Sequence, residues 1–154
     1  MPISAHKEGR TVVYEYGNGT ATVFSGGSAS WRTNNPGNLI AGNFSTRQGA
    51  IGSYYTGLAT LAIFLTFPIG LAAQEALIEA NHMSYTIDGF VRRYASEKFG
   101  KDVPAYQSYL RSWMSSPGST PLSSFSAGQL NRFMAGVRHH EGFQPGTTTI
   151  RVGP

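Results

Sequence analysis

Cysteine is absent from this 154-residue chain, and charged residues are scarce, at 13%. The chain as written therefore has no disulfide, no thiolate metal site and no cysteine nucleophile. Such a composition suits a protein that works in either redox compartment. Lys and Arg also form no run, which argues against binding to nucleic acid.

Long hydrophobic runs are missing as well. The most apolar window, residues 57–77, is interrupted by Thr, Pro, Gly and Gln and includes Glu75. We therefore expect a buried strand followed by a core helix there, and no membrane span. The first thirty residues lack a basic segment followed by an apolar one, so no secretory signal is visible. A protein of this kind that acts outside the cytoplasm needs another route of delivery.

The residues that are present indicate a globular protein. Hydrophobic residues make up 40% of the sequence, which also has 19 glycines and 8 prolines. This length and composition predict one domain with a real core and many turns. The net charge of +4 favours acidic partners. Anionic lipid and the acidic polymer of the bacterial cell wall both fit that balance.

Two segments near the N-terminus are rich in β-branched and aromatic residues, residues 11–16 and 20–24. The Gly17-Asn18-Gly19 sequence between them predicts a β-hairpin. Residues 1–10 are polar, and we expect them to be loose. Glu15 is a minor catalytic candidate that a solvated charge explains more simply.

Three helices are predicted in the middle of the chain. Pro68 suits the first turn of a helix that runs to about Asn81. Thr86 and Asp102 can cap a second and a third helix, and residues 115–124 form a connecting loop. The residues expected to face inward are Ile69, Ala72, Ala73, Ala76, Leu77 and Ala80 on the first helix, Ile87, Phe90, Val91 and Tyr94 on the second, and Tyr106, Tyr109 or Leu110, Trp113 and Met114 on the third.

The last helix carries the strongest pattern. Ser126 and Gln129 form a capping-box sequence. The apolar residues that follow recur at helical spacing, and they are Leu130, Phe133, Met134 and Val137. Glu141 continues the same face, and Gly142 ends the helix. Burial and the negative end of the helix dipole both disfavour a charge there, so we expect the pKa of Glu141 to be raised toward the range of a general acid. A solvated surface glutamate is the alternative interpretation.

Residues 26–43 form a loop rich in glycine and asparagine. Asn34, Asn35 and Asn38 follow Trp31 in it. Amide groups beside an aromatic ring are a common way to hold a sugar. Asparagines that fix a turn through local hydrogen bonds explain the same residues equally well.

Several motifs in one order resemble lytic transglycosylases and the related lysozyme-like domains of phage structural proteins and of effectors of contractile (type VI) secretion systems. The matching segments are Asn34-Asn-Pro-Gly-Asn-Leu39, Gly49-Ala-Ile-Gly52, Phe67-Pro68, Gly70–Leu77, Thr86-Ile87, Arg93-Tyr-Ala95, Tyr106 and His140-Glu-Gly142 within Arg138–Pro145. The resemblance covers residues 31–145. Gly142 follows the glutamate directly, where these enzymes usually have a serine.

The resemblance implies an α+β, mainly α fold: a small N-terminal β-hairpin extension, residues 1–30, and a lysozyme-like helical domain, residues 31–154. The glutamate helix comes last here, whereas it comes first in those enzymes, which suggests a circular permutation. Glu141 is then the catalytic acid, and Tyr94 orients the sugar or stabilises charge. A core aromatic residue is the alternative interpretation of Tyr94. Substrate contacts are expected from Trp31, Asn34, Asn35, Asn38 and His140. Glu141, Asn34, Asn35 and Tyr94 are expected in one cleft.

The implied activity is cleavage of the MurNAc–GlcNAc glycan strand of peptidoglycan, without metal or cofactor. The protein would be an antibacterial effector or phage-type lysin, secreted without a signal peptide, that acts in the periplasm or wall of a target bacterium. An immunity protein is an expected partner. One carboxylate suffices if the sugar's own hydroxyl closes a 1,6-anhydro ring, whereas hydrolysis needs a second. Asp88 and Asp102 fit helix first turns better, and Glu97 fits a surface charge.

Two other functions remain open. A zinc amidase or endopeptidase could draw ligands from His82, His139, His140 and Glu141. Adjacent helical histidines point about 100° apart, however, and the chain has no HExxH spacing. A non-catalytic wall-binding or tail-structural module is the second alternative, with exposed Tyr and Trp side chains as its binding groups.

Overall fold

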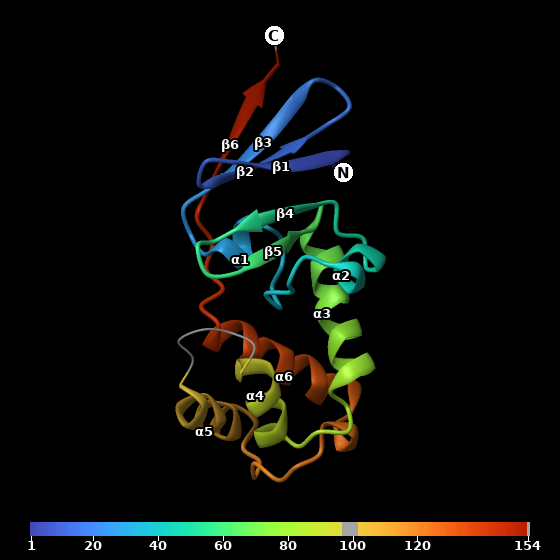
Figure 1. Ribbon diagram of the computed structural model, residues 1–154, viewed down its shortest axis with the longest axis vertical. Helices are drawn as coiled ribbons and strands as arrows, with labels where there is room; N and C mark the ends of the chain where they lie inside the picture. Colours follow the sequence, from blue (N-terminus) through green and yellow to red (C-terminus); the bar gives the residue numbers. More distant parts are fainter. Residues whose placement is uncertain (97–101, 154) are drawn as a thin grey trace. The chain divides into compact units, whose positions relative to one another are not determined.

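A computed structural model describes residues 1–96 and 102–153 of the chain. The fold is α+β and mainly helical, with a small antiparallel sheet that contains the N-terminal strands, which confirms the predicted fold class (Figure 1). Two compact units divide the chain. Unit 1 comprises residues 1–74 and 142–154, and unit 2 comprises residues 75–141. The predicted boundary at residue 30 falls inside unit 1, which extends to residue 74 and also includes the last residues of the chain.

Unit 1 contains a four-stranded antiparallel sheet in the order β1-β2-β3-β6 (Figure 1). Its strands are β1 (Ser4–Glu8), β2 (Thr11–Glu15), β3 (Thr20–Ser25) and β6 (Thr147–Val152). The β2–β3 pair, with Val12 opposite Phe24, confirms the predicted hairpin. The prediction that residues 1–10 are loose was wrong, because β1 pairs with β2 along its whole length.

Glycines let the C-terminal segment approach the start of the loop after β3. A Cβ atom on Gly146 would lie 2.2 Å from the Ser25 carbonyl oxygen, and one on Gly27 would lie 2.5 Å from the Gln144 carbonyl oxygen. Ser28 and Gln144 are joined here by a backbone hydrogen bond of 2.9 Å. Larger side chains would push the two segments apart, so these glycines allow β6 to pair with β3.

A second antiparallel pair completes the strands of unit 1, β4 (Gly52–Tyr55) and β5 (Thr60–Ile63). Two short helices, α1 (Ala29–Arg32) and α2 (Asn43–Arg47), precede it. The segment of α1 was expected to be loop. The core between the sheet and the β4–β5 pair consists of Ala5, Val12, Tyr14, Tyr54 and Ile63.

Helix α3 (Phe67–Asn81) begins and ends close to the predicted positions, and its second half opens unit 2. Its inward face differs from the prediction, since Ala72 and Ala80 are exposed whereas Gln74 and Ile78 are buried. Apolar residues surround this helix on most sides, so the sequence did not define one face. No helix in the described ranges is long and apolar enough to cross a membrane.

Unit 2 continues with α4 (Ile87–Ser96), α5 (Val103–Met114), a short 3-10 helix (Leu122–Ser124) and α6 (Ala127–His140). All three predicted caps are confirmed. Thr86 Oγ1 accepts a hydrogen bond from Gly89 N–H at 3.0 Å, and an Asp102 carboxylate oxygen accepts one from Ala105 N–H at 3.1 Å. Ser126 and Gln129 form the reciprocal capping box.

The core of unit 2 lies among these helices. The predicted inner face of α4 is confirmed, with Ile87, Phe90 and Val91 fully buried. The predicted apolar stripe of α6 is also buried and comprises Leu130, Phe133, Met134 and Val137. Phe90 and Phe133 meet edge to face, with ring centroids 5.0 Å apart.

Candidate functional site

Glu141 occupies the C-cap of α6, as its place in the sequence predicted. Its backbone N–H donates to the Val137 carbonyl oxygen at 2.9 Å, and Gly142 then adopts a left-handed φ of 77° that ends the helix. The side chain is half-buried, and its Oε2 atom is shielded from solvent. A carboxyl group with one shielded oxygen can face a ligand with the other.

Tyr106 of α5 is fully buried and lies within electrostatic range of this carboxyl group, although its hydroxyl makes no hydrogen bond of good geometry among the described residues. Burial is the main reason that the pKa of the Tyr106 phenol lies far above its usual value, and the negative charges available at Tyr94 and Glu141 raise it further. The phenol therefore keeps its proton at any physiological pH. The structure thus brings Tyr94, Tyr106 and Glu141 to one place within unit 2.

His140 packs its ring against α5. Its imidazole stacks on Tyr106 with ring centroids 3.8 Å apart, and the ring of Tyr109 lies 5.0 Å away. The neighbouring His139 instead lies against Trp113, at 5.0 Å. The two adjacent histidines therefore diverge, as their helical spacing predicted.

His82, the third histidine considered for a metal site, is buried in the aromatic core. Its ring meets Phe90 edge to face at 5.1 Å. Among the residues that the structure describes, no three His, Cys, Asp or Glu side chains are grouped so that they could hold a metal ion.

Tyr94 is only 4% exposed and stacks on Phe90, with ring centroids 4.9 Å apart. This packing makes it part of the core of unit 2 and leaves little of its surface for a substrate. Its contribution to the site is its proximity to the Tyr106 hydroxyl. That proximity supports a role in shaping the surroundings of Tyr106 more than direct contact with a sugar.

Asn34 and Asn35 hold the loop after α1 against β5. The Asn35 side-chain amide donates to the Leu39 and Ala62 carbonyl oxygens at 2.8 and 3.0 Å, and its oxygen accepts from Leu39 N–H at 2.8 Å. Asn34 donates to the Phe64 carbonyl oxygen at 3.3 Å. Asn35 is fully buried, so these bonds favour the structural alternative over a sugar contact.

Trp31 and Asn38, the other predicted substrate contacts in this loop, are half-buried. Trp31 stacks on Phe24 with ring centroids 4.6 Å apart. Asn38 adopts a left-handed φ of 52°, which asparagine tolerates well. The cleft predicted to join this loop with Glu141 involves residues of both units, and it stays a prediction.

The possible second carboxylates are used elsewhere where the structure describes them. Asp88 lies in the first turn of α4 and pairs with the Arg111 guanidinium, with Nε 2.9 Å from Oδ1. Asp102 caps α5. The first-turn prediction is confirmed for Asp88, whereas Asp102 is the N-cap residue directly before the first turn of α5, the capping role that was also predicted for it. Glu97 lies outside the described residues.

Tyr106 was predicted on the inner face of α5 and is one of the residues that carry the resemblance, but it was not selected as a site residue. Its approach to Glu141 depends on how α5 packs against α6, and no local signal reports that packing. No protein-family model matches the chain, and no curated protein sequence matches it. The chemistry must therefore be inferred from the residues themselves.

Proposed function

We propose that this protein cleaves the glycan strand of peptidoglycan between MurNAc and GlcNAc, with Glu141 as the acid. The observation that supports this proposal is the surroundings of its carboxyl group. Glu141 is half-buried at the end of α6, has one shielded oxygen, and lies beside the buried phenol of Tyr106. The resemblance of residues 31–145 to lytic transglycosylases supplies the substrate class.

Glycoside cleavage requires a proton for the leaving oxygen and stabilisation of an oxocarbenium-like transition state. In the proposed reaction Glu141 gives its proton to the glycosidic oxygen, and the electron pair of the C1–O bond leaves with that oxygen. The Tyr106 phenol, which keeps its proton, then stabilises the carboxylate that has formed. Tyr106 is therefore a positioning residue that acts through Glu141.

The second half of the reaction can use one carboxylate. The 6-hydroxyl of the same sugar attacks C1 and returns its proton to Glu141, which closes a 1,6-anhydro ring. Asp88 is paired with Arg111 and Asp102 caps a helix. This use of both residues favours the single-carboxylate route over hydrolysis with a second described carboxylate.

The test compares turbidity loss of purified sacculi for the parent and for Glu141→Gln. We expect a loss of about 100-fold or more in rate, the usual contribution of a general acid. Glu79→Gln, which changes an exposed glutamate of α3, is the matched control and should keep full activity. Equal rates for the parent and Glu141→Gln would overturn the proposal.

The products decide which bond is cut. Mass spectrometry of the released fragments should find 1,6-anhydro ends. Reducing ends would indicate hydrolysis, and cut peptides lost on chelation would indicate the zinc alternative. Binding to sacculi without release of fragments would indicate a wall-binding module.

The proposed activity implies a place of action and a partner. The substrate lies in the wall or periplasm of a target bacterium, which suits an antibacterial effector or phage-type lysin. A producing cell with the same wall then needs an inhibitor protein. Co-purification of such a protein with the chain would test this part of the proposal.

A further inference from the structure

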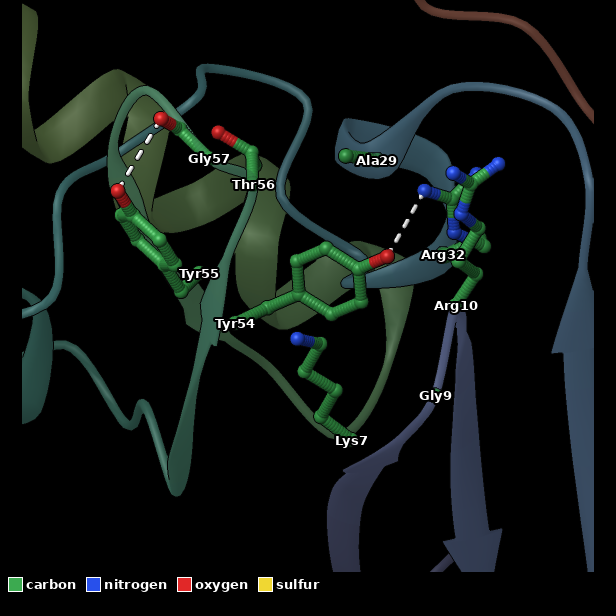
Figure 2. A pocket seen from close by; sticks show the side chains of 9 residues that line it. All are labelled: Lys7, Gly9, Arg10, Ala29, Arg32, Tyr54, Tyr55, Thr56 and Gly57. Carbon is green, nitrogen blue, oxygen red and sulfur yellow. Dashed lines mark hydrogen bonds between the residues drawn. The ribbon is translucent and has the colours of Figure 1, made fainter.

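A pocket of about 520 Å³ opens in unit 1, next to the β1–β2 turn, the β4–β5 turn and α1 (Figure 2). Its wall is formed by three cationic and two tyrosine side chains together with small residues of the turns. These lining residues are Lys7, Gly9, Arg10, Ala29, Arg32, Tyr54, Tyr55, Thr56 and Gly57. The volume suits a small molecule or a short peptide segment rather than a single ion.

The charge of this pocket is entirely positive. None of its lining residues is acidic, and Lys7, Arg10 and Arg32 form no ion pair with a carboxylate in the described ranges of the chain. The adjacent Glu8 is paired with Arg151 at 3.1 Å instead. Three uncompensated cations around one hollow attract an anion.

Arg32 is held in place by the protein. One of its terminal nitrogens donates to the Gly26 and Gly27 carbonyl oxygens at 2.9 and 2.8 Å, and the other donates to the Tyr54 hydroxyl at 3.1 Å (Figure 2). Its Nε atom is shielded from solvent and has no hydrogen-bond partner among the described residues. The positive charge is thus fixed before any ligand arrives, which lowers the entropy cost of binding.

Tyr54 connects the charges. The centroid of its buried ring lies 5.0 Å from the Lys7 ammonium and 5.4 Å from the Arg32 guanidinium. Both cations therefore make cation–π contacts with the same ring. Figure 2 shows Lys7 directed toward this ring, and Arg10 is a further cation in the wall of the pocket. Arg10 is exposed, and its planar fork is available for a ligand.

We propose that this pocket binds the carboxylates of an acidic peptide of about tripeptide size, which for this protein is the stem peptide of peptidoglycan. The identity of the peptide rests on the proposed function. The hydroxyl groups of Tyr55 and Thr56 serve the β4–β5 turn, because Tyr55 donates to the Gly57 carbonyl oxygen and Thr56 accepts from Leu58 N–H. The Tyr54 hydroxyl accepts from Arg32. Recognition is then left mainly to the nitrogens of Lys7 and Arg10, because those of Arg32 already bond to Gly26, Gly27 and Tyr54. The planar fork of Arg10 matches a planar carboxylate.

The first test is an NMR titration of the parent chain with the free tripeptide alanyl-γ-glutamyl-diaminopimelate. We expect shift changes at the backbone amides of Gly9, Arg10 and Gly57. The same peptide with its carboxylates converted to amides should bind roughly tenfold more weakly or worse, because charge-assisted hydrogen bonds are lost. Inorganic phosphate is the third ligand, and tighter binding of phosphate than of the tripeptide would overturn the proposal.

The second test removes the charges. Lys7→Ala combined with Arg10→Ala should weaken tripeptide binding about tenfold, and added salt should weaken parent binding in the same direction. Arg32 is kept, because its bonds to Gly26 and Gly27 support the fold. The control is Arg47→Ala, an exposed arginine of α2 outside the pocket, which should change binding less than about twofold. Unchanged binding in the double variant would overturn the proposal.

The cleavage assay separates this proposal from the proposed function. Tripeptide binding that depends on Lys7 and Arg10, in a parent chain that does not cleave sacculi, keeps the pocket and overturns the enzymatic proposal. Cleavage that depends on Glu141, without tripeptide binding, overturns the pocket alone.

Discussion

The ring of Tyr106 stacks on the imidazole of His140, with the two ring centroids 3.8 Å apart. This contact joins α5 to the last residue of α6, directly before Glu141. Because Tyr106 is fully buried, the end of α6 is held by tertiary packing as well as by its own hydrogen bonds. The place of the proposed acid therefore depends on an aromatic pair.

Tyr106→Phe removes the hydroxyl beside Glu141 and keeps the ring stack. We expect cleavage of sacculi to fall about tenfold or more, as when a preorganised donor is lost, with a loss in unfolding free energy of only about 1 kcal/mol. The pH–activity profile should also change, which a purely structural role would not produce. Tyr109→Phe, on the same helix, is the control and should keep both the rate and the profile.

Tyr106→Ala deletes the ring as well. Its unfolding free energy should fall by about 3–5 kcal/mol, as for other buried aromatic residues. Urea unfolding measures this difference. An alanine variant as stable as the phenylalanine variant would show that the stack with His140 does not hold the two helices together.

Asn35→Ala should destabilise unit 1, because the Asn35 side chain holds the loop and takes no direct part in glycan cleavage. The substitution leaves the Leu39 N–H and the Ala62 carbonyl oxygen without the Asn35 side chain as partner, whereas the Leu39 carbonyl oxygen keeps its hydrogen bond from Ala62 N–H. We expect a loss of about 1–3 kcal/mol for each buried group left unsatisfied. Urea unfolding is the measurement, with the exposed Asn131→Ala as a control of unchanged stability. If the variant kept its full stability but lost cleavage, Asn35 would be assigned to substrate binding instead.

Substitution of alanine for glycine should have opposite effects on stability at two positions of α6. A Cβ atom on Gly136 would lie 2.6 Å from Trp113 Cδ1, whereas one on Gly128 would meet nothing within 4 Å. Gly136→Ala should therefore cost about 1–3 kcal/mol through overpacking. Gly128→Ala should be neutral or stabilise by up to about 1 kcal/mol, because alanine favours the helix. Thermal unfolding of the two variants side by side checks the predicted difference in sign.

The pair of Glu8 and Arg151 makes the stability of the sheet depend on pH. Its hydrogen bonds and charge attraction with Arg151 lower the pKa of Glu8 below its usual value of 4.5. A lowered pKa contributes stability that is fully present above about 4.5 and is lost as the pH falls through the folded-state pKa. Both side chains are exposed, so the effect is small and salt screens it.

Thermal unfolding between pH 7 and pH 3 at low salt measures that dependence. Glu8→Gln and Arg151→Gln should each reduce the loss of Tm on acidification, and the double variant should reduce it no further. Additive effects of the two single changes would show that the residues do not act as a pair.

The helix boundaries could be predicted because their signals are local. Thr86, Asp102 and Ser126 each accept a hydrogen bond from a backbone N–H three residues later, so a short window of sequence contains both partners. Strand β6 has its partner β3 at the other end of the chain, and all six of its residues are exposed. Neither its pairing nor a buried face was visible in the sequence.

The residues of the site also differ in whether a local pattern of sequence could predict their positions. The position of Glu141 at the end of a helix follows from the pattern of α6, and its meeting with Tyr106 depends on the packing of α5. Asn34 and Asn35 could not be assigned a role from composition, because an amide that holds a loop and an amide that holds a sugar are the same residue type. In the structure their amides donate to the carbonyl oxygens of Ala62, Phe64 and Leu65, which favours the role of holding the loop.

Strand β6 has a consequence for the order of folding. The ribosome makes β3 early, and all of unit 2 follows before β6 appears. During synthesis the edge of β3 stays without its final partner while the helices of unit 2 can already pack. A nascent chain stalled before residue 147 would therefore present an open sheet edge, a surface on which a chaperone or another unfinished chain could pair.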